Sequence, residues 1–186
     1  MTNSLIPDRR AAALQAQDRR AASLQAQAYA ASNQAPIQAE DLAVFSRNHA
    51  HYLKEASRLK RDQRVTFRSK VRWVSVAAAV NRSGAPRQIY FCEIDRGSQV
   101  RYQADLVQVQ VDPSRKSAVT IALLKHVLKS TKPEKLWDDS VQTLYVISNC
   151  RKLKKPFPQT RLRRQDSNRP LSKDYIRSYA LVHELV

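Results

Sequence analysis

Hydrophobic and polar residues follow a helical spacing in the first third of the chain and mainly a two-residue alternation after it. A ten-residue unit occurs twice near the start, at 8–17 and 18–27, and consists mostly of the strong helix formers Ala, Leu, Gln and Arg. At about 100° per residue, ten residues turn the helix by about 1000°, so Leu14 and Leu24 lie about 80° apart around the helix axis. The repeat therefore forms no straight apolar seam. The pattern predicts a helical repeat arm over 1–35 that is mobile or depends on a partner.

The next segment, 36–63, is predicted to contain one amphipathic helix, because apolar residues recur at three- and four-residue steps between Glu40 and Arg61. The apolar face of this helix would pack on the rest of the chain or on a second subunit, and the sequence leaves both open. On such a helix the side chains of His49 and His51 point about 200° apart. A metal ion shared by the two is therefore not expected.

From residue 64 onward, β-branched and aromatic residues alternate with polar ones, which is typical of strands. A hairpin loop is predicted at 96–98, and a change of phase at Leu106-Val107 predicts a bulge or bend. Helical spacing returns over 117–129 and predicts one inserted helix. The fold class expected is α+β, with a mixed or mostly antiparallel sheet in a domain over 64–186. The predicted strands are 71–80, 89–95, 100–111, 143–149 and 178–185.

The charge of the chain indicates the kind of partner. Lys and Arg number 33 against 16 Asp and Glu, a formal net charge of +17, which favours a polyanionic partner such as nucleic acid. Residues 150–177 hold ten basic and two acidic residues. Leu153, Phe157 and Leu162 interrupt them, which indicates a segment anchored to the folded body rather than a solvated basic loop. The phosphate contacts expected are Arg151, Lys152, Lys154, Lys155, Arg161, Arg163, Arg164 and Arg169.

Composition also argues against several classes of protein. The longest apolar stretch, 74–80, is far shorter than a membrane span and no signal segment opens the chain, so a cytoplasmic or nucleoid-associated protein is expected. Two Cys without His at finger spacing build no zinc site, and two Gly build no glycine-rich phosphate loop. No cofactor or metal is expected. For Cys150, the neighbouring Arg151 and Lys152 would lower the thiol pKa, whereas a buried position at a strand end would leave the thiol inert.

Four strand segments together resemble the PUA-like superfamily, and within it the EVE and ASCH branch. They are IYFCEID at 89–95, VRYQADLVQVQVDP at 100–113, TLYVI at 143–147 and YALV at 179–182, and the similarity extends over about residues 65–186. The resemblance implies a small curved β-barrel that binds RNA or DNA and accepts one base, sometimes a modified one, in an aromatic pocket. The pocket lining that it implies here is Trp73, Tyr90, Tyr102 and Tyr145. On a strand whose valines face the core, Trp73 would stand on the opposite, exposed face.

The function expected is that of a non-enzymatic nucleic-acid-binding protein, in which the basic residues hold phosphates and the pocket around Trp73 examines a base. One alternative is a structural or assembly protein that docks on RNA or an acidic partner through its basic residues and forms oligomers through its N-terminal helices. Another is a small nuclease or modification enzyme whose site the sequence does not reveal. The sequence does not distinguish DNA from RNA as the ligand.

Overall fold

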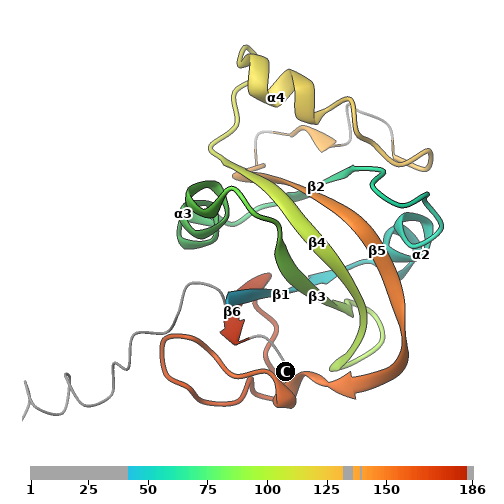
Figure 1. Cartoon of the computed structure of the whole chain (residues 1–186), viewed down its shortest axis with the longest axis vertical. Coiled ribbons are helices and arrows are strands. Elements are labelled where there is room, and N and C mark those ends of the chain that lie inside the picture. The colour runs from blue at the N-terminus through green and yellow to red at the C-terminus, as the bar shows by residue number, and fades with distance from the viewer. Residues whose placement is uncertain (1–41, 132–135, 139, 184–186) are drawn as a thin grey trace, which may run out of the picture. The chain divides into compact units, whose positions relative to one another are not determined.

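The computed structural model describes residues 42–131, 136–138 and 140–183, which form one six-stranded mixed sheet (Figure 1). The strand order is β2-β5-β4-β3-β1-β6; β1 runs parallel to β3, and every other neighbouring pair is antiparallel. The strands are β1 (Leu42–Asn48), β2 (Val65–Ser69), β3 (Arg87–Glu93), β4 (Gln99–Val111), β5 (Thr143–Pro158) and β6 (Tyr179–His183). The repeat arm expected over 1–35 lies outside the described residues.

Three helices with described bounds connect these strands. They are α2 (Ala50–Ala56) between β1 and β2, α3 (Val74–Ser83) between β2 and β3, and α4 (Ala118–Leu123) between β4 and β5, and a short 3-10 turn η2 (Gln159–Arg161) follows β5. Leu53 and Ala56 are the buried residues of α2, and Val76 and Val80 are those of α3, which packs on β4. Among the residues with assigned positions, no helix is long and apolar enough to cross a membrane.

Apolar side chains pack on both faces of the central strands. On β1, Val44 belongs to the main core with α2 and α3, whereas Phe45 belongs to a second core on the opposite face. Leu162 and Leu171, from the segment after β5, complete this second core and are fully buried. β1 is therefore covered on both sides, which accounts for its continuous apolar start at 42–45.

The single helix expected over 36–63 is wrong for 42–48, which form β1 at the interior of the sheet. Only Ala50–Ala56 of the described part is α-helical, as α2. A short apolar run that is buried on both faces carries no strand alternation, so its periodicity does not distinguish it from a buried helix. β1 and α2 belong to the same compact unit as the later strands.

The strand expected over 71–80 is also wrong, because Val74–Ser83 form α3. The three alanines at 77–79 favour a helix, and Gly84, at φ 65°, ends it in the left-handed conformation that glycine adopts readily. Trp73 is consequently not on an exposed strand face. It stands at the N-cap of α3 and is fully buried.

The other expected strands are confirmed, with different ends. The segments 89–95 and 100–111 form β3 and β4 around the predicted hairpin loop, and the pairing of β4 with β5 shifts register between Leu106 and Gln108, at the predicted bulge. β5 continues to Pro158, well beyond the predicted end, and the helix expected over 117–129 is limited to α4. The expected closed barrel does not form among the described residues, since β2 and β6 remain edges of the sheet.

Candidate functional site

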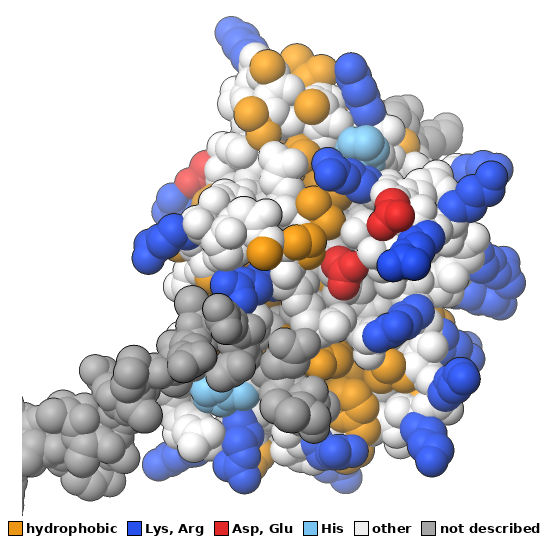
Figure 2. All heavy atoms as spheres, viewed as in Figure 1, with side chains coloured by type: hydrophobic (Ala, Val, Ile, Leu, Met, Phe, Trp, Pro, Cys, Tyr) orange, Lys and Arg blue, Asp and Glu red, His pale blue; other side chains and the backbone are white. Residues whose placement is uncertain are grey.

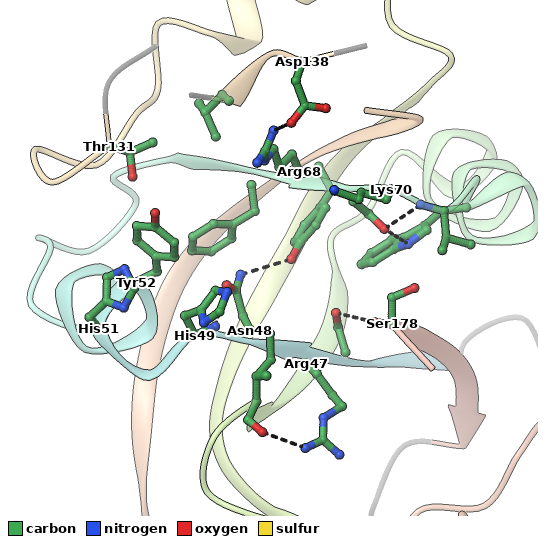
Figure 3. Close-up of a pocket in the computed structure, with 18 residues that line it drawn as sticks. Arg47, Asn48, His49, His51, Tyr52, Arg68, Lys70, Thr131, Asp138 and Ser178 are labelled. Carbon is green, nitrogen blue, oxygen red and sulfur yellow. Dashed lines mark hydrogen bonds and ion pairs between the residues drawn. The ribbon is translucent and has the colours of Figure 1, made fainter. Parts of the chain in front are cut away.

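A cavity of about 650 Å³ lies between β1 and β2, and we call it the β1–β2 cavity (Figure 3). These strands are not hydrogen-bonded neighbours. Arg68 and Lys70 border it from β2 and the residues that follow, Arg47 and Asn48 border it from β1, and the start of α2 lies at one end. Segments distant in the sequence thus form one concave site of ligand size.

The deep wall of the β1–β2 cavity is a fixed stack of aromatic rings. The rings of Trp73 and Tyr145 stack with centroids 4.4 Å apart and an interplanar angle of 19°, and Tyr179 lies 5.0 Å from Trp73. The Trp73 indole N–H donates to Ser69 Oγ at 3.1 Å, and its backbone N–H donates to Thr143 Oγ1 at 3.0 Å. A base cannot enter between Trp73 and Tyr145 without separating them, so this stack supports the cavity rather than gripping a ligand.

Three further aromatic rings, more exposed than this stack, lie at the α2 end of the cavity. His51 and Tyr52 have ring centroids 3.9 Å apart, and His49 lies 6.0 Å from Tyr52 in an edge-to-face arrangement. Both histidines are exposed, and Tyr52 is half-buried. Because His49 precedes α2 instead of lying within a helix, its ring is a neighbour of His51, at 5.7 Å. Within the described ranges, no group of three or more His, Cys, Asp or Glu side chains could hold a metal ion.

A buried amide presents polar atoms to the same cavity. Asn48 Nδ2 donates to the Tyr145 hydroxyl oxygen at 3.4 Å, and Asn48 Oδ1 accepts from the backbone N–H of His49 at 2.8 Å. These contacts fix the orientation of the amide, which keeps a second N–H for a ligand acceptor. Burial raises the pKa of the Tyr145 hydroxyl, so it stays neutral and retains its proton.

Cationic side chains form the rim of the cavity. The Arg47 guanidinium donates to the carbonyls of Tyr175 and Ile94, both at 3.2 Å, which holds it beside the opening. Arg68 forms an ion pair with Asp138. Hydrogen bonds from the Ser140 hydroxyl and from Arg68 lower the pKa of Asp138 to about 2. The carboxylate is therefore ionised at neutral pH and offsets the charge of Arg68.

Asp138→Asn should strengthen the binding of a polyanion at this rim. Because the folded-state pKa lies below the usual carboxyl value, Asp138 is protonated only as the pH falls below about 4 towards 2. At pH 7 the substitution therefore removes a full negative charge and frees Arg68. One added phosphate contact steepens the slope of log affinity against log salt concentration by about 0.7 for a single strand. At 0.1 M salt this corresponds to an affinity about fivefold higher. Titrations at two salt concentrations measure this, and weaker binding would contradict it.

Two of the four expected pocket residues, Trp73 and Tyr145, line the β1–β2 cavity, and the other two do not. Tyr90 points to the second core, where its ring lies 5.9 Å from Phe157. Tyr102 is almost fully buried and borders a different cavity. Tyr90 is placed away from the cavity because successive residues of a strand face opposite sides of the sheet.

Sequence reasoning missed the cavity residues on β1, α2 and β2, among them Asn48, Tyr52 and Phe67. Asn48 and Tyr52 were assigned to one long helix, on which their approach to β2 could not be foreseen. The signal that could have revealed them is the unbroken apolar run 42–45, which is typical of a strand buried on both faces.

The first four expected phosphate contacts lie on the outer half of β5, which is a strand and not a loop. Leu153 and Phe157 pack against the second core, as predicted for an anchored segment. Figure 2 shows Lys and Arg side chains along the side of the sheet domain where α2 and β5 run. The side chains exposed on this outer half are Arg151, Lys152, Lys154 and Lys155.

The remaining four expected contacts follow β5 and are also mostly exposed. The Arg161 guanidinium lies over the Phe157 ring at 5.6 Å, and Arg163 donates to the Asn168 carbonyl at 3.1 Å. Arg164 forms an ion pair with Asp166. Part of the positive charge of this segment is therefore neutralised or tied to the fold. The exposed residues are Arg161, Arg163 and Arg169, and Arg164 is half-buried.

Cys150 is not activated by its basic neighbours. Burial raises the pKa of the Cys150 thiol to about 12, and no lowering by Arg151 or Lys152 offsets it. The thiol is therefore protonated at neutral pH and inert. Cys150 is half-buried within β5, so it is neither activated by its neighbours nor buried at the end of a strand.

No family model, no characterised protein and no solved structure matches the chain.

Proposed function

We propose that the chain binds a strand of nucleic acid, takes one unstacked base into the β1–β2 cavity and holds the adjoining phosphates with Lys and Arg side chains. The observation that carries this proposal is the combination in one cavity of partly exposed aromatic rings, a fixed amide and a cationic rim. The volume of about 650 Å³ is in the range of small-molecule sites. The net charge of +17 fits a polyanionic ligand.

The rings at the α2 end supply stacking for the base. A nucleobase that leaves its strand loses stacking energy, and an aromatic side chain returns about 1–3 kcal/mol per base. Tyr52 and His51 line the cavity and are more exposed than the buried pair Trp73 and Tyr145. The free N–H of Asn48 reaches towards an acceptor on the base edge, which gives the site a means to discriminate between bases.

The exposed cations on β5 supply affinity that does not depend on sequence. Lys and Arg contacts to phosphates release counterions, so binding through them weakens as salt rises. A single strand fits better than a duplex, because extruding a base from a duplex costs a few kcal/mol of unstacking and unpairing. We include in this proposal a relationship of the chain to the PUA-like superfamily. The curved mixed sheet and its aromatic cavity support that relationship.

Tyr52→Ala should remove the preference for one base while leaving most of the salt-dependent affinity. The loss of a stacking partner predicts weaker binding of the preferred base by about 5- to 100-fold, the equivalent of 1–3 kcal/mol. The measurement is a titration of labelled single- and double-stranded DNA and RNA, with and without modified bases, at two salt concentrations.

Tyr52→Phe is the matched control, because it keeps the ring at the same place and should keep the base preference. Urea unfolding of both variants separates a binding effect from reduced stability. Equal affinity of Tyr52→Ala and the unsubstituted protein for every base would place the base outside the β1–β2 cavity. Failure of the unsubstituted protein to bind any of these strands would overturn the proposed function.

A further inference from the structure

A second cavity, of about 600 Å³, lies on another side of α2, and we call it the basic cavity. Its cations come from four places in the sequence: Lys54 and Arg58 from α2 and the turn after it, Arg96 from the β3–β4 loop, Arg101 from β4 and Lys152 from β5. Glu93 and Asp95 are its two carboxylates. Five cations against two carboxylates leave an excess of three positive charges, without counting histidine. Only Lys152 belongs to the basic segment that the sequence singled out.

A buried carboxylate organises the arginines of the basic cavity. The Glu93 side chain is only 5% exposed, and its Oε2 lies 3.6 Å from Arg101 Nε and 3.8 Å from Arg96 Nε. Neither Glu93 Oε2 nor Arg101 Nε has a hydrogen-bond partner among the described residues. Buried polar atoms are rarely left without partners, so Arg101 Nε is a donor for which an additional acceptor is expected. Glu93 holds the two arginines at the cavity wall by ion pairing, which orders their remaining donors in advance of a ligand.

The basic cavity adjoins the β1–β2 cavity. His51 lines both of them, and His49 of the β1–β2 cavity has its Nδ1 3.7 Å from Asp95 Oδ2 of the basic cavity. A group bound in one is therefore separated from a group bound in the other by little more than the start of α2.

We propose that the basic cavity binds a phosphate of the same strand, next to the nucleotide whose base enters the β1–β2 cavity. This inference rests on the proposed function. Guanidinium groups from three separate segments offer forked donors, which match the oxygens of a phosphate, and Lys54 and Lys152 add positive charge. The strand would cross the start of α2, where His49 and His51 lie between base and phosphate. Such a path fixes the direction in which the strand enters the base site.

Arg58→Gln combined with Arg101→Gln, in the full chain, tests this inference with two probes. Calorimetry with inorganic tripolyphosphate measures the anion site alone, and titration of a labelled single strand at several salt concentrations measures the phosphate binding. We expect tripolyphosphate affinity to fall at least tenfold. The slope of log affinity against log salt concentration for the strand should fall by about 0.7, the contribution of one neutralised phosphate. The base preference should not change. The control is Arg82→Gln with Lys116→Gln, which removes two exposed cations from α3 and from the loop before α4.

The outcomes separate this inference from the proposed function. If the double variant and its control bind both probes alike, the inference is overturned, while a base preference that Tyr52→Ala removes would leave the proposed function standing. If the unsubstituted protein binds tripolyphosphate but no strand, both are overturned. An acidic peptide that binds through Arg58 and Arg101 more tightly than tripolyphosphate would overturn the assignment to phosphate. Arg58 is exposed, so Arg58→Gln alone, with a smaller loss of tripolyphosphate affinity, serves if the double variant fails to fold.

Discussion

Trp73→Ala should lower the free energy of unfolding by about 3–5 kcal/mol, the usual cost of truncating a large buried aromatic side chain to alanine. Trp73 is fully buried, stacks on Tyr145 at 4.4 Å and donates its indole N–H to Ser69 Oγ. Its truncation opens a void at the junction of α3 and β5 and removes this buried hydrogen bond. Urea unfolding followed by far-UV circular dichroism measures the change.

Trp137→Ala is the matched control, because this tryptophan is only half-buried and its ring has the Arg115 guanidinium at 5.6 Å. A much smaller drop in stability is expected there, since the half-buried ring buries a smaller part of its apolar surface. A Trp73→Ala protein of unchanged stability that no longer prefers one base would show that Trp73 contacts the base directly, as the sequence first suggested. An unfolded variant without binding would agree with the structural role.

Replacing the exposed cations Arg151, Lys154 and Lys155 by Gln should weaken nucleic-acid binding about 100-fold at 0.1 M salt. Each phosphate that a cation neutralises contributes about 0.7 to the slope of log affinity against log salt concentration for single-strand binding. Removing three cations therefore lowers this slope by about 2. These residues lie on the outer half of β5, and Leu153 and Phe157 anchor the same strand to the second core. The substitutions therefore remove charge without removing core residues, and unfolding stability should stay nearly constant.

The matched control for this triple variant replaces Arg82, Lys116 and Lys125, which are exposed on α3 and around α4. It removes the same net charge, so it separates a local interaction from the general field of a basic protein. An equal decrease of affinity in both triple variants would mean that β5 makes no phosphate contacts. The base preference should survive in both, since neither touches the β1–β2 cavity.

The sequence predicted the elements whose pattern is complete within one segment. β4 alternates along most of its length, β3 is a short apolar run between polar residues, and 96–98 has the composition of a short loop. The hairpin therefore followed from local signals. The alternation also changes phase at Leu106-Val107, where the register shifts. Anchoring of the basic segment was predictable too, because apolar residues such as Leu162 recur between the charges and need burial.

Only the tertiary structure decided the elements and the site that depend on distant neighbours. The run 42–45 is a strand because β3 and β6 pair with it and cores cover both faces, and none of these partners is visible in the local pattern. Trp73 is buried because α3, not a strand, follows it. The β1–β2 cavity joins residues from β1, α2, β2 and β5, and the basic cavity joins Lys54 to Lys152. A periodicity reports which face of its own segment is apolar, whereas the curvature of the sheet determines which segments meet across a cavity.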